Sequence, residues 1–105
     1  MEETLRRYEI LLPLNFNNGK AVPAQSLAQT RLELKERFGA ISIESQVIRG
    51  EDEESGATRD RLIRFFVDVP DTESNAAFFR EWKERLKERF QQVDIWMTTH
   101  PIKRL

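Results

Sequence analysis

Four polar residues that follow the first apolar run are the side chains best suited to binding a ligand. Asn15, Asn17, Asn18 and Lys20 together offer amide donors, amide acceptors and one cation. Beside the N-terminus of a following helix, such a group can hold an anion or a small polar molecule. Asn18-Gly19 is also a strong turn dipeptide, so the alternative is that these asparagines only shape the backbone. We predict a small polar ligand here and leave the turn-forming role open.

Residue types that carry metal or nucleophilic chemistry are scarce. His100 is the single histidine, and there is no cysteine, which excludes disulfides, thiolate catalysis and cysteine metal sites. The acidic run 51–54 lacks the alternating ligands and the central glycine of a calcium loop. No nucleophile elbow and no glycine-rich phosphate loop is present. We therefore predict no catalytic residue, no metal and no cofactor, and we expect His100 to be an exposed or hydrogen-bonded histidine near the chain end.

The charge balance argues against nucleic acid as a partner. The 105 residues carry 17 basic and 18 acidic side chains, a formal net charge of -1, whereas phosphate-backbone binding needs a basic excess. An RNA-recognition sheet would need an aromatic residue where Arg64 stands. No apolar run approaches the length of a membrane span, and the N-terminal residues lack the apolar core of a signal peptide. We expect a cytoplasmic protein that binds neither nucleic acid nor membrane.

The elements that position these residues follow from hydrophobic periodicity. We expect strands over 8–14, 40–49, 61–69 and 93–99, and helices over 23–38 and 73–90. Gly39 marks the end of the first helix, and Pro70-Asp71-Thr72 separates the third strand from the second helix. The order β-α-β-β-α-β is that of the ferredoxin-like fold. The sequence thus predicts one α+β domain, residues 1–105, with a four-stranded antiparallel sheet and two helices on one face.

Alternation within each strand separates the helix-covered face from the other face. The residues expected to face the helices are Tyr8, Ile10, Leu12, Ile41, Ile43, Val47, Ile63, Phe65, Val67, Val69, Val93, Ile95 and Met97. They would meet two helical stripes, which are Leu27, Thr30 or Arg31, Leu34 and Phe38 on the first helix, and Ala76, Phe79, Trp82, Leu86 and Phe90 on the second. This pattern predicts a single core between the sheet and the helices.

The sheet face without helices, which we call the open face, carries more large apolar side chains than a solvated surface requires. The residues expected there as a dimer or partner surface are Leu11, Ile48, Leu62, Arg64, Phe66 and Trp96, with Glu9, Glu44, Asp68 and Thr98 between them. We predict a homodimer through this face. Two alternatives remain: an uneven surface partly covered by the C-terminal tail, and a face that binds a ligand or another protein.

Three segments resemble a family of short bacterial proteins of uncharacterised activity. They are Leu12-Pro-Leu-Asn-Phe-Asn-Asn-Gly19, Arg37-Phe-Gly39 and Leu86-Lys-Glu-Arg-Phe-Gln-Gln92. The resemblance spans nearly the whole chain and implies no chemistry. More loosely, the size and expected fold resemble the dimeric α/β-barrel superfamily, in which two ferredoxin-like sheets pair face to face and some members are cofactor-free oxygenases. No functional residue transfers from either resemblance.

Three functional hypotheses follow. The first is a homodimeric, non-enzymatic module that recognises a small ligand or a protein partner. The second is a small-molecule enzyme of the dimeric α/β-barrel type, with Asn15, Arg64, Trp96 or His100 lining a cavity. The third is a regulatory sensor that binds an anion beside the first helix. The absence of catalytic motifs favours the first.

Overall fold

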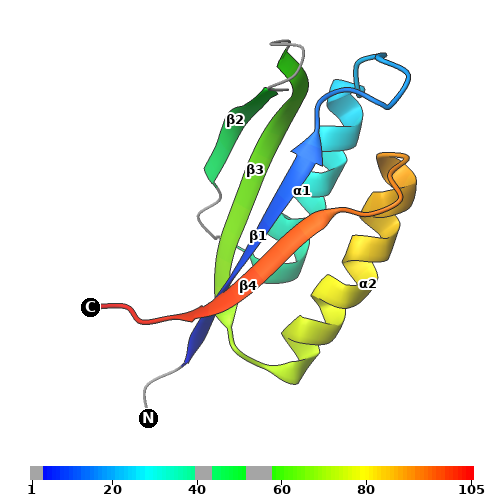
Figure 1. Ribbon diagram of the computed structural model, residues 1–105. Helices are drawn as coiled ribbons and strands as arrows, with labels where there is room; N and C mark the ends of the chain where they lie inside the picture. The colour runs from blue at the N-terminus through cyan, green and yellow to red at the C-terminus, as the bar shows by residue number, and fades with distance from the viewer. Residues whose placement is uncertain (1–3, 40–43, 52–57) are drawn as a thin grey trace.

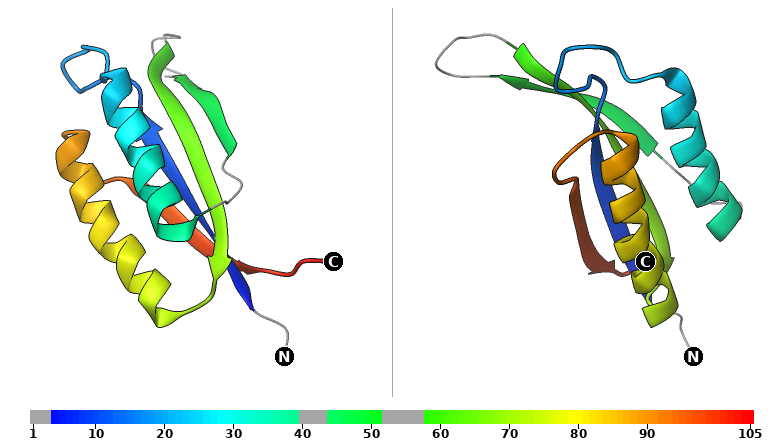
Figure 2. Two further views of the ribbon diagram at one scale, coloured as in Figure 1. Left: turned by 180° about the vertical axis from the view of Figure 1, so that it is seen from behind. Right: turned by 90° about the vertical axis from the view of Figure 1, so that its right-hand side faces the viewer.

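The computed structural model describes residues 4–39, 44–51 and 58–105. Along the chain the elements are β1 (Leu5–Pro13), α1 (Ala24–Phe38), β2 (Glu44–Glu51), β3 (Thr58–Pro70), α2 (Glu73–Arg89) and β4 (Trp96–Ile102). The strands pair antiparallel in the order β2-β3-β1-β4. Both helices cover one face of the sheet (Figure 1, Figure 2). The predicted α+β class is confirmed, and the arrangement is consistent with a ferredoxin-like fold.

The core forms where the alternating strand residues meet the helices. Tyr8, Ile10 and Leu12 of β1 are buried, as are Phe65, Val67 and Val69 of β3. The helices contribute Thr30 and Leu34 from α1, and Phe79, Trp82 and Leu86 from α2. The stripes predicted for both helices are therefore confirmed, with Thr30 and not Arg31 facing inward. At the centre, the Tyr8 and Phe79 rings stack with their centroids 3.8 Å apart.

A polar clamp joins the two helices. Arg89 of α2 donates from Nη1 and Nη2 to the two carboxylate oxygens of Glu33 on α1, at 2.8 and 2.7 Å. The buried Trp82 donates from Nε1 to Glu33 Oε1 at 2.9 Å, and Arg89 Nη1 also donates to Thr30 Oγ1 at 2.8 Å. Partial burial by itself raises the pKa of the Glu33 carboxyl. The hydrogen bonds from Arg89 and Trp82 and the nearby positive charges lower this pKa by more than burial raises it, so it lies below the ordinary value. Glu33 is thus held as a carboxylate.

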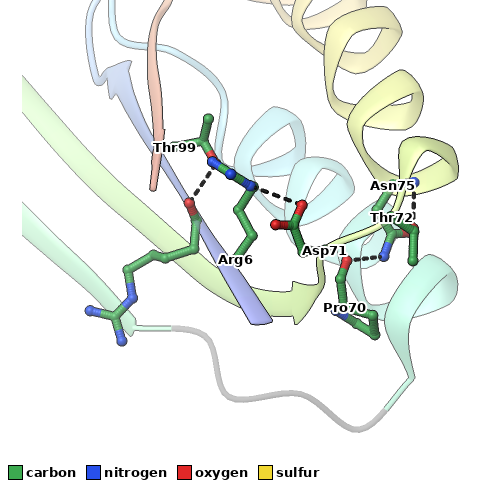
Figure 3. Close-up of polar contacts among 7 residues, drawn as sticks. Arg6, Pro70, Asp71, Thr72, Asn75 and Thr99 are labelled. Carbon is green, nitrogen blue, oxygen red and sulfur yellow. Dashed lines mark hydrogen bonds and ion pairs between the residues drawn. The ribbon is translucent and has the colours of Figure 1, made fainter. Parts of the chain in front are cut away.

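The start of α2 is fixed by side-chain hydrogen bonds (Figure 3). The Thr72 hydroxyl accepts from the Asn75 backbone N–H at 3.1 Å, as expected of an N-cap. The Asn75 amide donates to the Pro70 carbonyl at 2.9 Å. Arg6 of β1 reaches Asp71 at 3.0 Å and the Thr99 hydroxyl at 3.5 Å. The junction between β3 and α2 is therefore attached to both β1 and β4.

Several predicted boundaries were wrong. β1 begins at Leu5 rather than Tyr8, because Leu5 pairs with both Pro70 and Ile102. β4 runs from Trp96 to Ile102 instead of 93–99. Val93, predicted to be buried, is 93% exposed, since the turn after α2 delays the start of the strand. β4 continues through Pro101, because an edge strand tolerates a residue without an N–H donor. The predicted strand residues 40–43, with Ile41 and Ile43, lie outside the described residues.

Candidate functional site

The loop between β1 and α1 folds back on itself. Asn15 and Ala21 form an isolated antiparallel bridge, and the Val22 N–H donates to the Leu14 carbonyl at 2.9 Å. Gly19 closes the turn with φ 88°, a conformation that glycine adopts without a steric penalty. Within the turn, the Asn15 amide donates to the Gly19 carbonyl at 3.2 Å. This internal bonding gives the loop a defined shape and holds Asn15 at the end of the sheet.

The turn between α2 and β4 faces that loop. Gln91 adopts φ 54°, the left-handed conformation, and the helix ends in a Schellman motif, because the Gln91 and Gln92 N–H groups donate to the Glu88 and Lys87 carbonyls at 3.2 and 2.9 Å. The Gln92 side-chain amide then donates to Asn17 Oδ1 at 3.2 Å and to the Phe90 carbonyl at 3.1 Å. One side-chain hydrogen bond thus links two segments that are 75 residues apart.

A cleft of about 200 Å³ lies between these two segments and the end of the open face that carries Leu11, Leu62 and Trp96. Its lining residues are Leu11, Pro13, Asn15, Asn17, Leu62, Gln92, Asp94, Ile95 and Trp96. Apolar side chains from β1, β3 and β4 face three amides and one carboxylate. Among the described residues, this lining includes neither lysine nor arginine. Such a mixed, concave surface is typical of small-molecule sites.

Asp94 supplies the negative charge of the cleft. Its carboxylate accepts a hydrogen bond from Lys83, which lies 3.0 Å away. That bond lowers the pKa of Asp94, and a second bond from the Ile95 backbone N–H lowers it further. Asp94 is therefore ionised at neutral pH, and its charge is balanced by the Lys83 ammonium beside it.

The structure brings together some of the predicted ligand-binding residues and separates others. Asn15 and Asn17 line the cleft. Asn18 instead accepts the Lys20 backbone N–H at 3.0 Å and so shapes the turn, which is the alternative that the sequence left open. Lys20 is exposed and is not among the lining residues. Two further cleft residues, Gln92 and Asp94, were not predicted; the only signal was that the turn after α2 falls at the same end of the sheet.

The open face carries the apolar residues that alternation places there. The register sets Leu11 between Trp96 and Arg64, and Pro13 opposite Leu62. Trp96 is 66% exposed, and Leu11, Leu62 and Phe66 are half-buried. On β2, backbone register pairs Glu44 with Phe66 and Ile48 with Leu62. The open face is thus apolar at the end next to the cleft, where Leu11, Leu62 and Trp96 lie.

Two arginines flank the Phe66 ring. The guanidinium carbon of Arg7 lies 4.4 Å from the ring centroid, and that of Arg64 lies 5.5 Å from it. Arg7 also donates to both carboxylate oxygens of Asp68, at 2.7 and 3.0 Å. Arg64 Nε is buried and has no hydrogen-bond partner within the described part of the chain. An unpaired buried donor is costly, so this position lowers the stability of the fold.

A second hollow, of about 250 Å³, lies on the other side of the sheet between α2 and β4. Its lining is mainly apolar and comprises Tyr8, Ala76, Phe79, Arg80, Lys83, Met97, Thr98 and Thr99. The two cations at its rim already have partners, Glu73 at 2.6 Å from Arg80 and Asp94 at 3.0 Å from Lys83. The described residues of this hollow therefore offer no unpaired charge to a ligand.

His100 is exposed and lies opposite Arg7 in the register of β1 and β4. Of the four residues proposed to line a catalytic cavity, Asn15 and Trp96 line the cleft, whereas Arg64 and His100 do not.

Among residues 4–39, 44–51 and 58–105, no group of three or more His, Asp or Glu side chains could hold a metal ion. Neither of the described helices is long and apolar enough to cross a bilayer.

The fold and site define a small α+β protein, consistent with a ferredoxin-like arrangement, that carries a cleft at one end of its open face. No protein-family model matches the sequence, and no curated protein matches it. The resemblance to a family of short bacterial proteins therefore stays a prediction.

Two solved structures are similar to this chain in fold. A phage SAM lyase in complex with S-methyl-5′-thioadenosine superposes with a TM-score of 0.64 at 11% identity, over 99% of this chain and 93% of that chain. A Bacillus cereus protein related to NIF3 gives a TM-score of 0.53 at 11% identity, over 97% of this chain but only 26% of that chain. At such low identity the similarity extends to the fold alone.

Proposed function

We propose that residues 1–105 form a single four-stranded ferredoxin-like domain that acts as a homodimeric, non-enzymatic module recognising a small ligand. The observation that carries this proposal is Trp96, which is 66% exposed and belongs both to the open face and to the cleft lining. Large aromatic side chains are the usual anchors of interfaces and of ligand sites. Leu11 and Leu62 also belong to both surfaces, so a second subunit on the open face would flank the cleft.

The ligand proposed for this module is small and polar, and Asn15 and Asn17 are its contacts. Both amides line the cleft at its loop side, while Asn18 and Lys20 lie outside it and complete the loop. An anion-binding sensor has less support, because the cleft contains the Asp94 carboxylate and, among the described residues, its lining includes no cation.

The double variant Trp96→Ala, Phe66→Ala is expected to weaken the dimer at least tenfold, because each substitution removes a large apolar anchor from the open face. Sedimentation velocity over a range of concentrations measures the dissociation constant, and circular dichroism checks that helicity is unchanged. Leu32→Ala is the matched control, since Leu32 is also a large apolar residue and is 51% exposed, but on α1. The proposed homodimer would be contradicted if the wild-type protein stayed monomeric at its solubility limit, or if the double variant dimerised like the wild type.

A second candidate function is a small-molecule enzyme. What supports it is the phage SAM lyase, whose fold is similar over nearly the full length of both chains. If this chain shares that activity, incubation with S-adenosylmethionine is expected to release S-methyl-5′-thioadenosine, which liquid chromatography detects. Asn15→Ala should slow the release, because Asn15 lines the cleft, and Gln29→Ala on the exposed side of α1 should not. Release no faster than in buffer would eliminate this candidate.

A further inference from the structure

The cleft has one flat aromatic wall. In the single chain Trp96 is 66% exposed and lines the cleft, so a ring can stack on the part of the indole that faces the cleft while a second subunit covers the rest. The other tryptophan, Trp82, is fully buried and bonded to Glu33. Stacking of a planar ring on an exposed aromatic side chain stabilises a complex substantially, and it is independent of the identity of the ring.

The opposite wall offers unused hydrogen-bonding atoms. Within the described residues, the Asn15 amide uses its Nδ2 atom, Asn17 uses its Oδ1 atom and Gln92 uses its Nε2 atom. Each amide therefore retains its other polar atom, which leaves the acceptors Asn15 Oδ1 and Gln92 Oε1 and the donor Asn17 Nδ2. A ligand edge with both N–H donors and ring-nitrogen acceptors matches this set.

Charge and size narrow the ligand class further. Among the described lining residues Asp94 is the only titratable one, and its carboxylate is already paired with Lys83 at 3.0 Å, so these residues offer no cation to a phosphate or carboxylate group. The volume of about 200 Å³ lies below the roughly 300–1,000 Å³ of sites for drug-sized molecules. The cleft therefore suits a compact ring system without negative charge.

From this geometry we propose that the cleft binds an uncharged, planar nitrogen heterocycle, stacked on Trp96 with its polar edge on the amides of Asn15, Asn17 and Gln92. This inference rests on the proposed function, because it names the class of small ligand that the module recognises. The sources of such a ring include free bases and nucleosides, whereas the described lining residues offer no cation that would favour the phosphate of a nucleotide.

The test is a titration with adenosine followed by the indole N–H signals in ¹⁵N–¹H correlation spectra. The Trp96 signal, assigned from its loss in Trp96→Phe, is expected to shift on addition of adenosine, while the Trp82 signal stays in place. Adenosine monophosphate is expected to bind no more tightly than adenosine, because the described lining residues offer no cation to its phosphate, and ribose should not shift the Trp96 signal. Asn17→Ala should weaken adenosine binding about three- to tenfold, because one hydrogen bond is lost, whereas Gln29→Ala on α1 should leave it unchanged.

The outcomes separate this inference from the proposed function. If the Trp96 signal does not move with adenosine, or moves equally with ribose, the proposal that the cleft binds a heterocycle is wrong. If the dimer still depends on Trp96 and Phe66 in sedimentation, the proposed function stands after that failure. Equal binding of adenosine by Asn17→Ala and by the wild type would also overturn the inference, because the amide wall would then take no part.

Discussion

Replacing Trp82 by alanine is expected to lower the free energy of unfolding by about 3–5 kcal/mol. Trp82 is fully buried, and its ring contacts Phe78 and Phe79 with centroids 5.8 and 5.9 Å away. The substitution leaves a cavity between α2 and the sheet and removes the hydrogen bond to Glu33. Urea denaturation followed by circular dichroism measures the change.

Trp96→Ala is the matched control, because it removes the same side chain from an exposed position. It is expected to change the free energy of unfolding by less than about 0.5 kcal/mol when the protein is monomeric. A similar loss in both variants would mean that Trp82 is not part of a packed core. A Trp82→Ala protein that unfolds completely would agree with the prediction, since small domains have only about 5–15 kcal/mol of stability.

Glu33→Gln is expected to lower the free energy of unfolding at neutral pH by about 1–3 kcal/mol. The carboxylate accepts from Arg89 and Trp82, and its side chain and that of Arg89 are only 20% and 14% exposed. Glutamine keeps one acceptor for Trp82 but loses the charge that pairs with Arg89. The clamp between α1 and α2 is therefore weakened without a large change in volume.

This effect depends on pH in a defined direction. The pKa of Glu33 is lower in the folded protein than its ordinary value, so the carboxylate contributes its full stabilisation above the unfolded pKa, about 4.3. As the pH falls from there through the folded pKa, that contribution is lost. The difference between the wild type and Glu33→Gln should thus be constant above about pH 5.5 and shrink below about pH 4.3. Urea denaturation curves of both proteins, recorded at several pH values across this range, measure the difference in the free energy of unfolding.

The control for this pH series is Glu73→Gln, which removes the carboxylate of the exposed pair with Arg80. It is expected to change stability by less than about 0.5 kcal/mol. A Glu33→Gln difference that stayed the same at every pH would show that the charge of Glu33 does not stabilise the fold.

Much of the architecture could be predicted from periodicity, because burial on one side of a sheet or helix imposes a period that sequence displays. The α2 stripe from Phe79 to Leu86 and the outward orientation of Trp96 follow from that rule. Val93 was assigned wrongly, because a left-handed residue such as Gln91 (φ 54°) interrupts the alternation without a glycine to signal it. Local chain geometry, and not hydrophobicity, decided that position.

The candidate site was only partly predictable. Asn15 and Asn17 were proposed from their residue type, but Gln92 and Asp94 reach the cleft through the turn after α2, whose shape depends on backbone conformation. Likewise, nothing in the sequence pairs Glu33 with Trp82 and Arg89, because that contact arises only when α1 and α2 pack against each other. Contacts between elements distant in sequence carry no periodic signal.

The position of Pro101 restricts how copies of this chain can associate. β4 is an edge strand, and an edge strand normally offers its free backbone groups to another molecule, which allows sheets to extend from chain to chain and fibrils to grow. Proline has no N–H to donate, so it interrupts such growth at residue 101. Stacking of one sheet on another needs no backbone donors from β4. The proline therefore weakens edge-to-edge pairing through β4, one of the two edges of the sheet, while leaving face-to-face pairing available.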